Sequence, residues 1–254
     1  MPSDPLFYIV GLSAVFLIAF GRGAFGGGLA ILGVPLLALV IDPITATVMM
    51  APIVSAMDPF GFWAFPPRTW SRNDLVWLVP GLLCGLLLGA VFFVSVDPRL
   101  VAVGIAIVTL WFTARWFLRE RTAQPVGAPV NAPKALVCGT LAGFTTFIAH
   151  GGNAPIAIYL LPRGLSKTVF AGTNSALFTL GNSVKLVFYV WLVRQQPEAL
   201  WLAVLLMPAI PLGVWLGKLF HDRLAEDRLY LFCYLLVAAT GLKLLVDSLR
   251  ALLV

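Results

Sequence analysis

Long apolar runs recur along the whole chain and are separated only by short polar stretches. A helix needs about 20 apolar residues to cross a hydrocarbon core of roughly 30 Å, and several runs reach that length. The alternating ten-residue segments of membrane β-strands are absent from the sequence, so the pattern predicts an all-α polytopic membrane protein. The expected helical segments are 6–20, 29–41, 46–65, 75–95, 100–118, 135–149, 152–162, 167–192, 199–219 and 229–249.

These segments fall into two copies of one unit. A shift of 124 residues superimposes Phe20 on Phe144, Gly27 and Gly28 on Gly151 and Gly152, and Asp58 on Asn182. A shift of 128 residues aligns a second pattern, P-x4-G-x3-G, which occurs as Pro80, Gly85 and Gly89 and again as Pro208, Gly213 and Gly217. We therefore predict a first transmembrane repeat at 1–118, a proline-containing cytoplasmic linker at 119–133 and a second transmembrane repeat at 134–254.

The first two segments of each copy are short, and glycine-rich sequence lies between them. Segments of about 11 to 15 residues cross a bilayer poorly, so each pair is expected to be broken or re-entrant and to precede three transmembrane helices. If each pair returns to its starting side, ten of fourteen basic loop residues share the cytoplasmic face: Arg68, Arg72, Arg119, Arg121, Lys134, Arg163, Lys167, Lys218, Arg223 and Arg228, against Arg99, Arg194, Lys243 and Arg250. This positive-inside bias predicts two inverted repeats with both termini in the periplasm.

Composition narrows the class of protein further. Hydrophobic residues make up 60% of the chain and charged residues 11%, which excludes an ordinary soluble domain. The net charge of +6 comes from residues scattered over short loops, so we expect no nucleic-acid partner. Cys84, Cys138 and Cys233 lie within apolar runs, and we expect no metal site and no cofactor. The N-terminal MPSDPLF lacks a basic region, so we expect no cleaved signal peptide.

The glycine-rich breaks are the first candidate binding site. Backbone N–H groups at a broken membrane helix lose their partners, and together with a helix dipole they can bind an anion. The residues expected to supply such groups are Gly26, Gly27 and Gly28 in the first copy and Gly151, Gly152 and Asn153 in the second, with Arg22 and His150 alongside. Close helix packing is the alternative role of membrane glycines, and it is the role we assign to both P-x4-G-x3-G patterns.

Polar residues within apolar runs are the second set of candidates, because each is costly at membrane depth. Asp58 precedes Pro59, which is expected to kink its helix, and Asn182 and Lys185 share one helical face. The alternative is structural: Asp58 forms an ion pair with Lys185 or with Arg22. Four further residues are candidates for lining a polar path or for bonding to their own backbone, namely Thr145, Thr146, Thr173 and Asn174.

Two stretches together resemble the sulfite exporter TauE/SafE family over nearly the whole chain. The second-half stretch is GFTTFIAHGGNAPIAIYLLPRGLSKTVFAGTNSALFTLGNSVKLVFY, and the first-half stretch is GRGAFGGGLAILGVPLLAL followed by the Asp58 region. The resemblance implies a bacterial inner-membrane exporter of sulfite or of small organosulfonates such as sulfoacetate.

The sequence bears on three classes of function: an anion exporter, a channel or other transporter, and an enzyme. An anion exporter working by alternating access is the leading hypothesis, and a small anionic substrate and the lipid bilayer are its expected partners. A passive anion channel, or a transporter of another small anion or metabolite, is the alternative; the scarcity of intramembrane carboxylates disfavours a cation cage. No H-E-x-x-H, paired intramembrane aspartates or G-x-S-x-G occurs, so an enzyme is not expected. The sequence is compatible with a homodimer.

Overall fold

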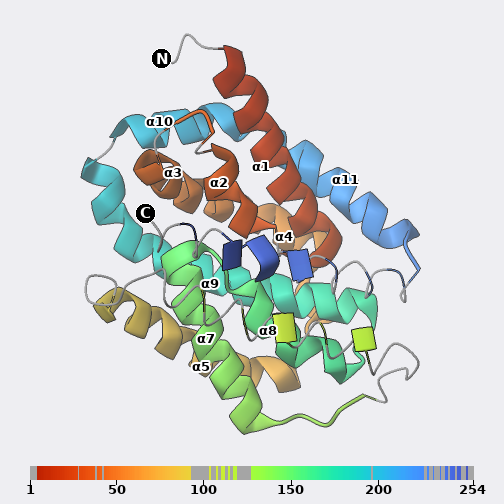
Figure 1. Cartoon of the computed structure of the whole chain (residues 1–254). Helices are drawn as coiled ribbons and strands as arrows, with labels where there is room; N and C mark the ends of the chain where they lie inside the picture. Colours follow the sequence, from red (N-terminus) through yellow and green to blue (C-terminus); the bar gives the residue numbers. More distant parts are fainter. Residues whose placement is uncertain are drawn as a thin grey trace. The chain divides into compact units, whose positions relative to one another are not determined.

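The computed structural model describes residues 5–27, 29–37, 39–41, 43–92, 127–195 and 197–225, with isolated positions between 93 and 126 and between 228 and 250. Every regular element in these ranges is a helix (Figure 1). The chain divides into two compact units, 1–70 with 171–224 and 71–170 with 225–254, which are described separately. Each unit takes segments from both predicted repeats.

The first unit contains most of the helices. They are α1 (Pro5–Phe25), η1 (Ala30–Leu32), α2 (Gly33–Leu37), α3 (Pro43–Ala56), α4 (Asp58–Ala64), η2 (Pro67–Thr69), α9 (Lys167–Gln195, which starts in the second unit), α10 (Pro197–Leu206) and α11 (Ala209–Arg223). Helix α11 lies along α1, and α10 packs on α3 (Figure 1). The core between them is apolar, with Val15, Met49 and Ile53 fully buried.

The second unit is built around one tight helix pair. Its elements are α5 (Arg72–Phe92), α7 (Ala132–Ala149), α8 (Asn153–Leu160) and η4 (Leu161–Arg163). Helix α7 begins at Ala132, before the expected start at residue 135, because the Asn131 side chain accepts a hydrogen bond from the Lys134 N–H at 2.9 Å and a proline occupies the first turn.

Proline marks the breaks in the long apolar segments. The expected helix at 46–65 is interrupted at Met57, and α4 begins at Asp58 with Pro59 in its first turn, as the predicted kink required. Helices α10 and α11 are bent by 45° at a break that contains Pro208. The bent pair could serve as one span.

Both P-x4-G-x3-G patterns are packing motifs, as predicted. A Cβ on Gly85 would overlap the Thr140 carbonyl oxygen of α7, and a Cβ on Gly213 would lie 2.8 Å from the Phe16 carbonyl oxygen of α1. Since 16 and 140 differ by 124, the two glycines face equivalent positions of the internal repeat. Glycine at these sites brings helix backbones into direct contact.

The lengths of the short helices differ from expectation. Helix α1 has 21 residues, because it continues past the expected end at residue 20 to Phe25. Helix α7 has 18 residues, because it starts at Ala132, before the expected start at residue 135. Within the described residues, Pro5–Phe25 and Arg72–Val91 are each long and apolar enough to cross a membrane, and the bent pair of α10 and α11 makes a third. Therefore α1 is not too short to span, and Arg22 belongs to a helix and not to the break.

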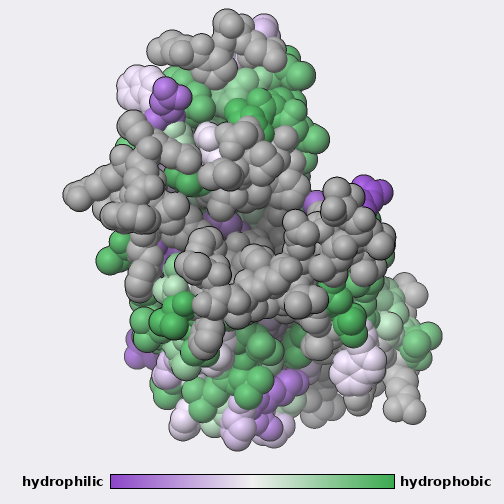
Figure 2. All heavy atoms as spheres, turned by 60° about the vertical axis from the view of Figure 1, so that its left-hand side comes forward, coloured by the Kyte–Doolittle hydropathy of each residue, from purple (hydrophilic) through white to green (hydrophobic). Residues whose placement is uncertain are grey.

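Apolar side chains also cover much of the outer surface. Large exposed hydrophobic residues occur on α1, α5, α10 and α11, including Ile9, Val91, Trp201 and Trp215. Figure 2 shows broad hydrophobic areas with hydrophilic residues in small groups. An outer surface of this kind is suited to lipid contact. The predicted helices at 100–118 and 229–249 lie largely outside the described residues, as do Gly28 and Cys233.

Candidate functional site

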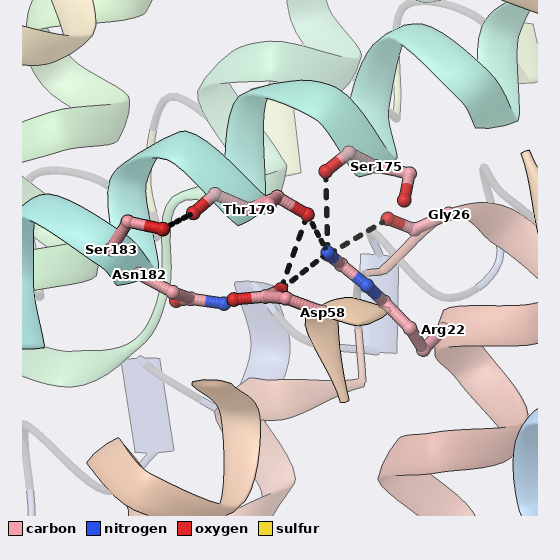
Figure 3. Close-up of polar contacts among 7 residues, drawn as sticks. All are labelled: Arg22, Gly26, Asp58, Ser175, Thr179, Asn182 and Ser183. Carbon is pink, nitrogen blue, oxygen red and sulfur yellow. Dashed lines mark hydrogen bonds and ion pairs between the residues drawn. The ribbon is translucent and has the colours of Figure 1, made fainter. Parts of the chain in front are cut away.

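An ion pair lies in the interior of the first unit. Arg22, in the last turn of α1, places its Nη2 2.6 Å from Oδ1 of Asp58, and the two side chains are only 6% and 10% exposed (Figure 3). The residues are 36 positions apart in sequence. Of the two predicted roles for Asp58, the structural alternative, an ion pair with Arg22, is thus present.

Helix α9 completes the coordination of Arg22. Its Nη2 also donates to Oγ1 of Thr179 at 2.5 Å and to the carbonyl oxygen of Ser175 at 3.3 Å (Figure 3). Its Nη1 donates to the Gly26 carbonyl oxygen at 3.4 Å. Arg22 Nε is buried, and no acceptor for it occurs in the described part of the chain. The arginine therefore connects the end of α1 to α4 and α9, and its Nε–H is left unused.

Asp58 is held through a single oxygen. Its Oδ1 accepts hydrogen bonds from Arg22, from Oγ1 of Thr179 at 3.2 Å and from Nδ2 of Asn182 at 3.2 Å. Asn182 is the repeat counterpart of Asp58, so equivalent positions of the two copies contact each other directly. Among the described residues, no donor reaches Oδ2.

Gly61 provides the space in which the guanidinium lies. A Cβ at this position would be 2.8 Å from Arg22 Nε, 3.1 Å from Arg22 Nη2 and 3.0 Å from Ser175 Oγ. Gly61 lies in α4, one turn after Asp58. The absence of a side chain therefore allows Arg22 to pack directly against the helix that carries its carboxylate partner.

A second cation lies near the pair. Lys185, one turn after Asn182 on α9, is 1% exposed, and its charge interacts with that of Asp58. Among the described residues of the first unit, the buried lysine, arginine and acidic residues are Arg22, Lys185 and Asp58. With both basic side chains protonated and Asp58 ionised, these three groups sum to one positive charge.

The break after α1 differs from the predicted anion cradle. The Gly26 N–H donates to the Arg22 carbonyl oxygen at 3.1 Å, and the Gly27 N–H donates to that of Gly21 at 3.2 Å. Gly26 has a φ of 74°, the left-handed conformation that a helix C-terminus of this type needs directly after the helix, and Gly27 has a φ of 142°. These two amides thus have backbone partners, which corrects the donor role expected of them.

Side chains satisfy the last carbonyl groups of α1. Nδ1 of His221 lies 2.8 Å from the Ala24 carbonyl oxygen, and Nδ2 of Asn174 donates to that of Phe25 at 3.3 Å. The end of α1 is the negative end of its dipole, and donors and the Arg22 cation surround it. In this unit the groups suited to an anion are therefore cationic side chains.

The second unit repeats the same helix ending. His150 follows α7 with a φ of 53°, and the Gly151 N–H donates to the Thr145 carbonyl oxygen at 3.2 Å. A shift of 124 residues maps this bond onto the one between Gly27 and Gly21. The Gly151 amide is thus also paired, so its expected donor role is corrected in the same way.

The remaining predicted residues divide between the two units. His150, Gly151, Gly152 and Asn153 belong to the second unit, where Gly152 precedes α8 and Asn153 begins it. Thr145 donates to its own helix at the Leu141 carbonyl oxygen, as membrane threonines often do. Of the other three, Thr146 is buried in the second unit, and Thr173 and Asn174 are buried in the first.

Sequence reasoning missed a second buried carboxylate. Asp74, in the first turn of α5, is 0% exposed and accepts hydrogen bonds from Tyr159 and from Arg163 Nε, each at 2.8 Å. Arg163 also donates to the Ala128 carbonyl oxygen. Asp74 is 85 positions from Tyr159, and an Asp in a first helical turn is so common that its sequence position gave no signal.

A family model matches most of the sequence. The model for the sulfite exporter TauE/SafE family matches residues 11–244, nearly the whole chain. The chain belongs to the sulfite exporter TauE/SafE family. No curated protein and no solved structure gave a match. Membership of TauE/SafE confirms the resemblance and makes the chain a membrane transporter of the sulfite exporter class; its several apolar helices suit a multi-pass protein of that family.

Proposed function

We propose that this TauE/SafE protein exports a small anion, sulfite or an organosulfonate such as sulfoacetate, across the bacterial inner membrane by alternating access. The proposed site is the interior of the first unit, centred on Arg22, Asp58, Asn182 and Lys185. His150, Gly152 and Asn153 in the second unit stay predicted contributors.

The observation that carries this proposal is the grouping of two buried basic side chains, Arg22 and Lys185, around one buried carboxylate, Asp58. Burying a cation without a counter-ion costs several kcal/mol, so two buried cations with one carboxylate favour the entry of a further negative charge. Arg22 retains an unused Nε donor beside Gly61. The several N–H donors of a guanidinium can bind two oxygens of one oxyanion at the same time.

Two further features support export by two inverted repeats. The equivalent helix endings after α1 and α7, and the equivalent contacts of Gly85 and Gly213, agree with a duplicated unit. The bias of basic loop residues supports the inverted relation, with periplasmic termini. Export of an anion from a cell that is negative inside is downhill by about 2.3 kcal/mol per charge per 100 mV, so uniport would suffice energetically.

The test is a flux and binding panel on purified full-length protein in liposomes, using sulfite, sulfate, sulfoacetate, taurine and acetate. We expect saturable flux of sulfite or sulfoacetate, and at least ten-fold weaker binding in Arg22→Gln and Lys185→Gln. Exposed Arg68 provides the control, because Arg68→Gln removes a cation without touching the interior. Normal anion binding by both interior variants would refute the proposed site, and non-saturable flux would favour a passive channel.

A further inference from the structure

We infer that Asp58 sets the charge of the anion that this interior accepts: a monoanion enters while Asp58 is ionised, and a dianion enters only together with a proton on Asp58. The inference rests on the proposed function and names the substrate class and the coupling of the same site.

The charges of the buried side chains match a monoanion. With Asp58 ionised and Lys185 protonated, the buried lysine, arginine and acidic groups described in the first unit sum to one positive charge, which a single negative charge neutralises. A dianion would leave one net negative charge in a low-dielectric interior. The same imbalance is removed when Asp58 takes up a proton, because the two cations then face two negative charges.

The three hydrogen bonds to Asp58 all end on Oδ1, and none of the described residues donates to Oδ2. A proton on Oδ2 therefore displaces none of these three donors. It weakens the charge interaction between Asp58 and Arg22, whose unused Nε donor can then bind an oxygen of the anion.

The charged groups that interact with Asp58 are Arg22 of α1 and Lys185 of α9. Two titratable groups of α11 face the other end of α4: His221 and Lys218 lie against the Phe65 ring, 5.1 Å and 5.3 Å from its centroid. His221 Nδ1 is engaged with the Ala24 carbonyl oxygen. Among the described residues of this unit, Asp58 is the buried carboxylate beside the two cations, so it is the group that takes up the proton.

The proton balance is simple. One proton from the solution binds to an Asp58 oxygen as the dianion arrives, no covalent bond of the anion changes, and the proton leaves Asp58 when the dianion is released. A transported dianion would then move with one proton, and a transported monoanion would move alone.

The experiment compares two sulfonates that carry no titratable group between pH 5.5 and 8. Binding of methanesulfonate, a monoanion, and of methanedisulfonate, a dianion, is measured on the full-length protein by calorimetry in buffers of different ionisation enthalpy. We expect about one proton taken up per methanedisulfonate and none per methanesulfonate. Methanedisulfonate affinity should rise by up to ten-fold for each unit that the pH falls, which is the slope for one linked proton.

The variant Asp58→Asn keeps the size of the side chain and one oxygen acceptor. In this variant we expect methanedisulfonate binding without proton uptake or pH dependence. Exposed Glu198 gives the matched control, since Glu198→Gln should retain the proton uptake of the wild type.

The outcomes separate the two proposals. Binding of both sulfonates by the wild type with no proton uptake overturns the inference and leaves the proposed function standing. Undiminished proton uptake in Asp58→Asn also overturns it, because the proton then binds elsewhere. If the wild type binds neither sulfonate and none of the anions in the flux panel, both proposals fail. Should Asp58→Asn not fold, the proton uptake of the wild type still decides.

Discussion

Replacing Gly61 by alanine tests whether the position of Arg22 depends on the missing side chain. The added methyl carbon would lie 2.8 Å from Nε of Arg22 and 3.0 Å from Oγ of Ser175. Ordinary contacts between non-bonded heavy atoms are about 3.5 Å or longer, so the guanidinium must move by several tenths of an ångström. That movement should lengthen the 2.6 Å contact between Arg22 and Asp58.

The expected magnitude follows from overpacking. Inserting a methyl group into a packed interior costs about 1–3 kcal/mol. For a chain of this size that lowers the unfolding temperature by roughly 2–12 °C. Anion affinity should fall as well, because the displaced guanidinium is a proposed ligand. Thermal unfolding followed by tryptophan fluorescence and sulfite binding would be measured on the same preparations.

Two comparisons make the result specific. In an Arg22→Lys background, the side chain lacks Nε and Nη2, so Gly61→Ala should cost less, with a coupling energy of roughly 0.5–3 kcal/mol between the two positions. Gly139 is the control: its added methyl would lie 2.6 Å from the Leu78 carbonyl oxygen of α5, so Gly139→Ala should lower stability and spare binding per folded molecule. If Gly61→Ala changes neither stability nor affinity, the packing of Arg22 against α4 does not position the site.

Three other predictions concern the fold and the topology. Gly85→Ala and Gly213→Ala should lower thermal stability by similar amounts, with transport per folded molecule unchanged; a selective loss of transport would contradict their packing role. A cysteine placed at Ala128 in a cysteine-free chain should react only with a probe on the cytoplasmic side of intact cells, and labelling from outside would refute the inverted topology. Asp74→Asn should destabilise by about 3–5 kcal/mol, because it leaves a part-buried arginine without its carboxylate, whereas Tyr159→Phe should cost about 1 kcal/mol, so equal unfolding temperatures would refute that ranking.

The sequence pattern predicted where the glycine breaks lie, but not whether the backbone groups freed there are amides or carbonyls. The glycines were correctly predicted to end a helix, because glycine tolerates the positive φ that such an ending requires. Whether the freed groups at a break are amides or carbonyls depends on which residue ends the first helix and where the next begins. Helix α1 continues to Phe25, so Gly26 and Gly27 cap its C-terminus with their own N–H groups.

The sequence pattern identified some of the residues that contact distant parts of the chain and missed others. Asp58, Asn182 and Lys185 were identified because a polar side chain is conspicuous inside an apolar run. Asp74 and His221 were missed, because each lies near the end of a helix, where charged and polar residues are common. Their buried roles depend on partners 85 and 197 positions away.

The sequence by itself determined the membrane class, the helical fold, the duplicated pattern, the packing glycines and the family, because hydropathy, periodicity and motif spacing are local properties of the chain. Only the tertiary structure decided that Asp58 pairs with Arg22, that Asn182 and Thr179 share its Oδ1, and that Gly61 makes room for the guanidinium. The physical reason is that a buried charge is stabilised by whichever donors and acceptors packing brings within about 3 Å. That choice depends on how α1, α4 and α9 meet, which no local pattern encodes.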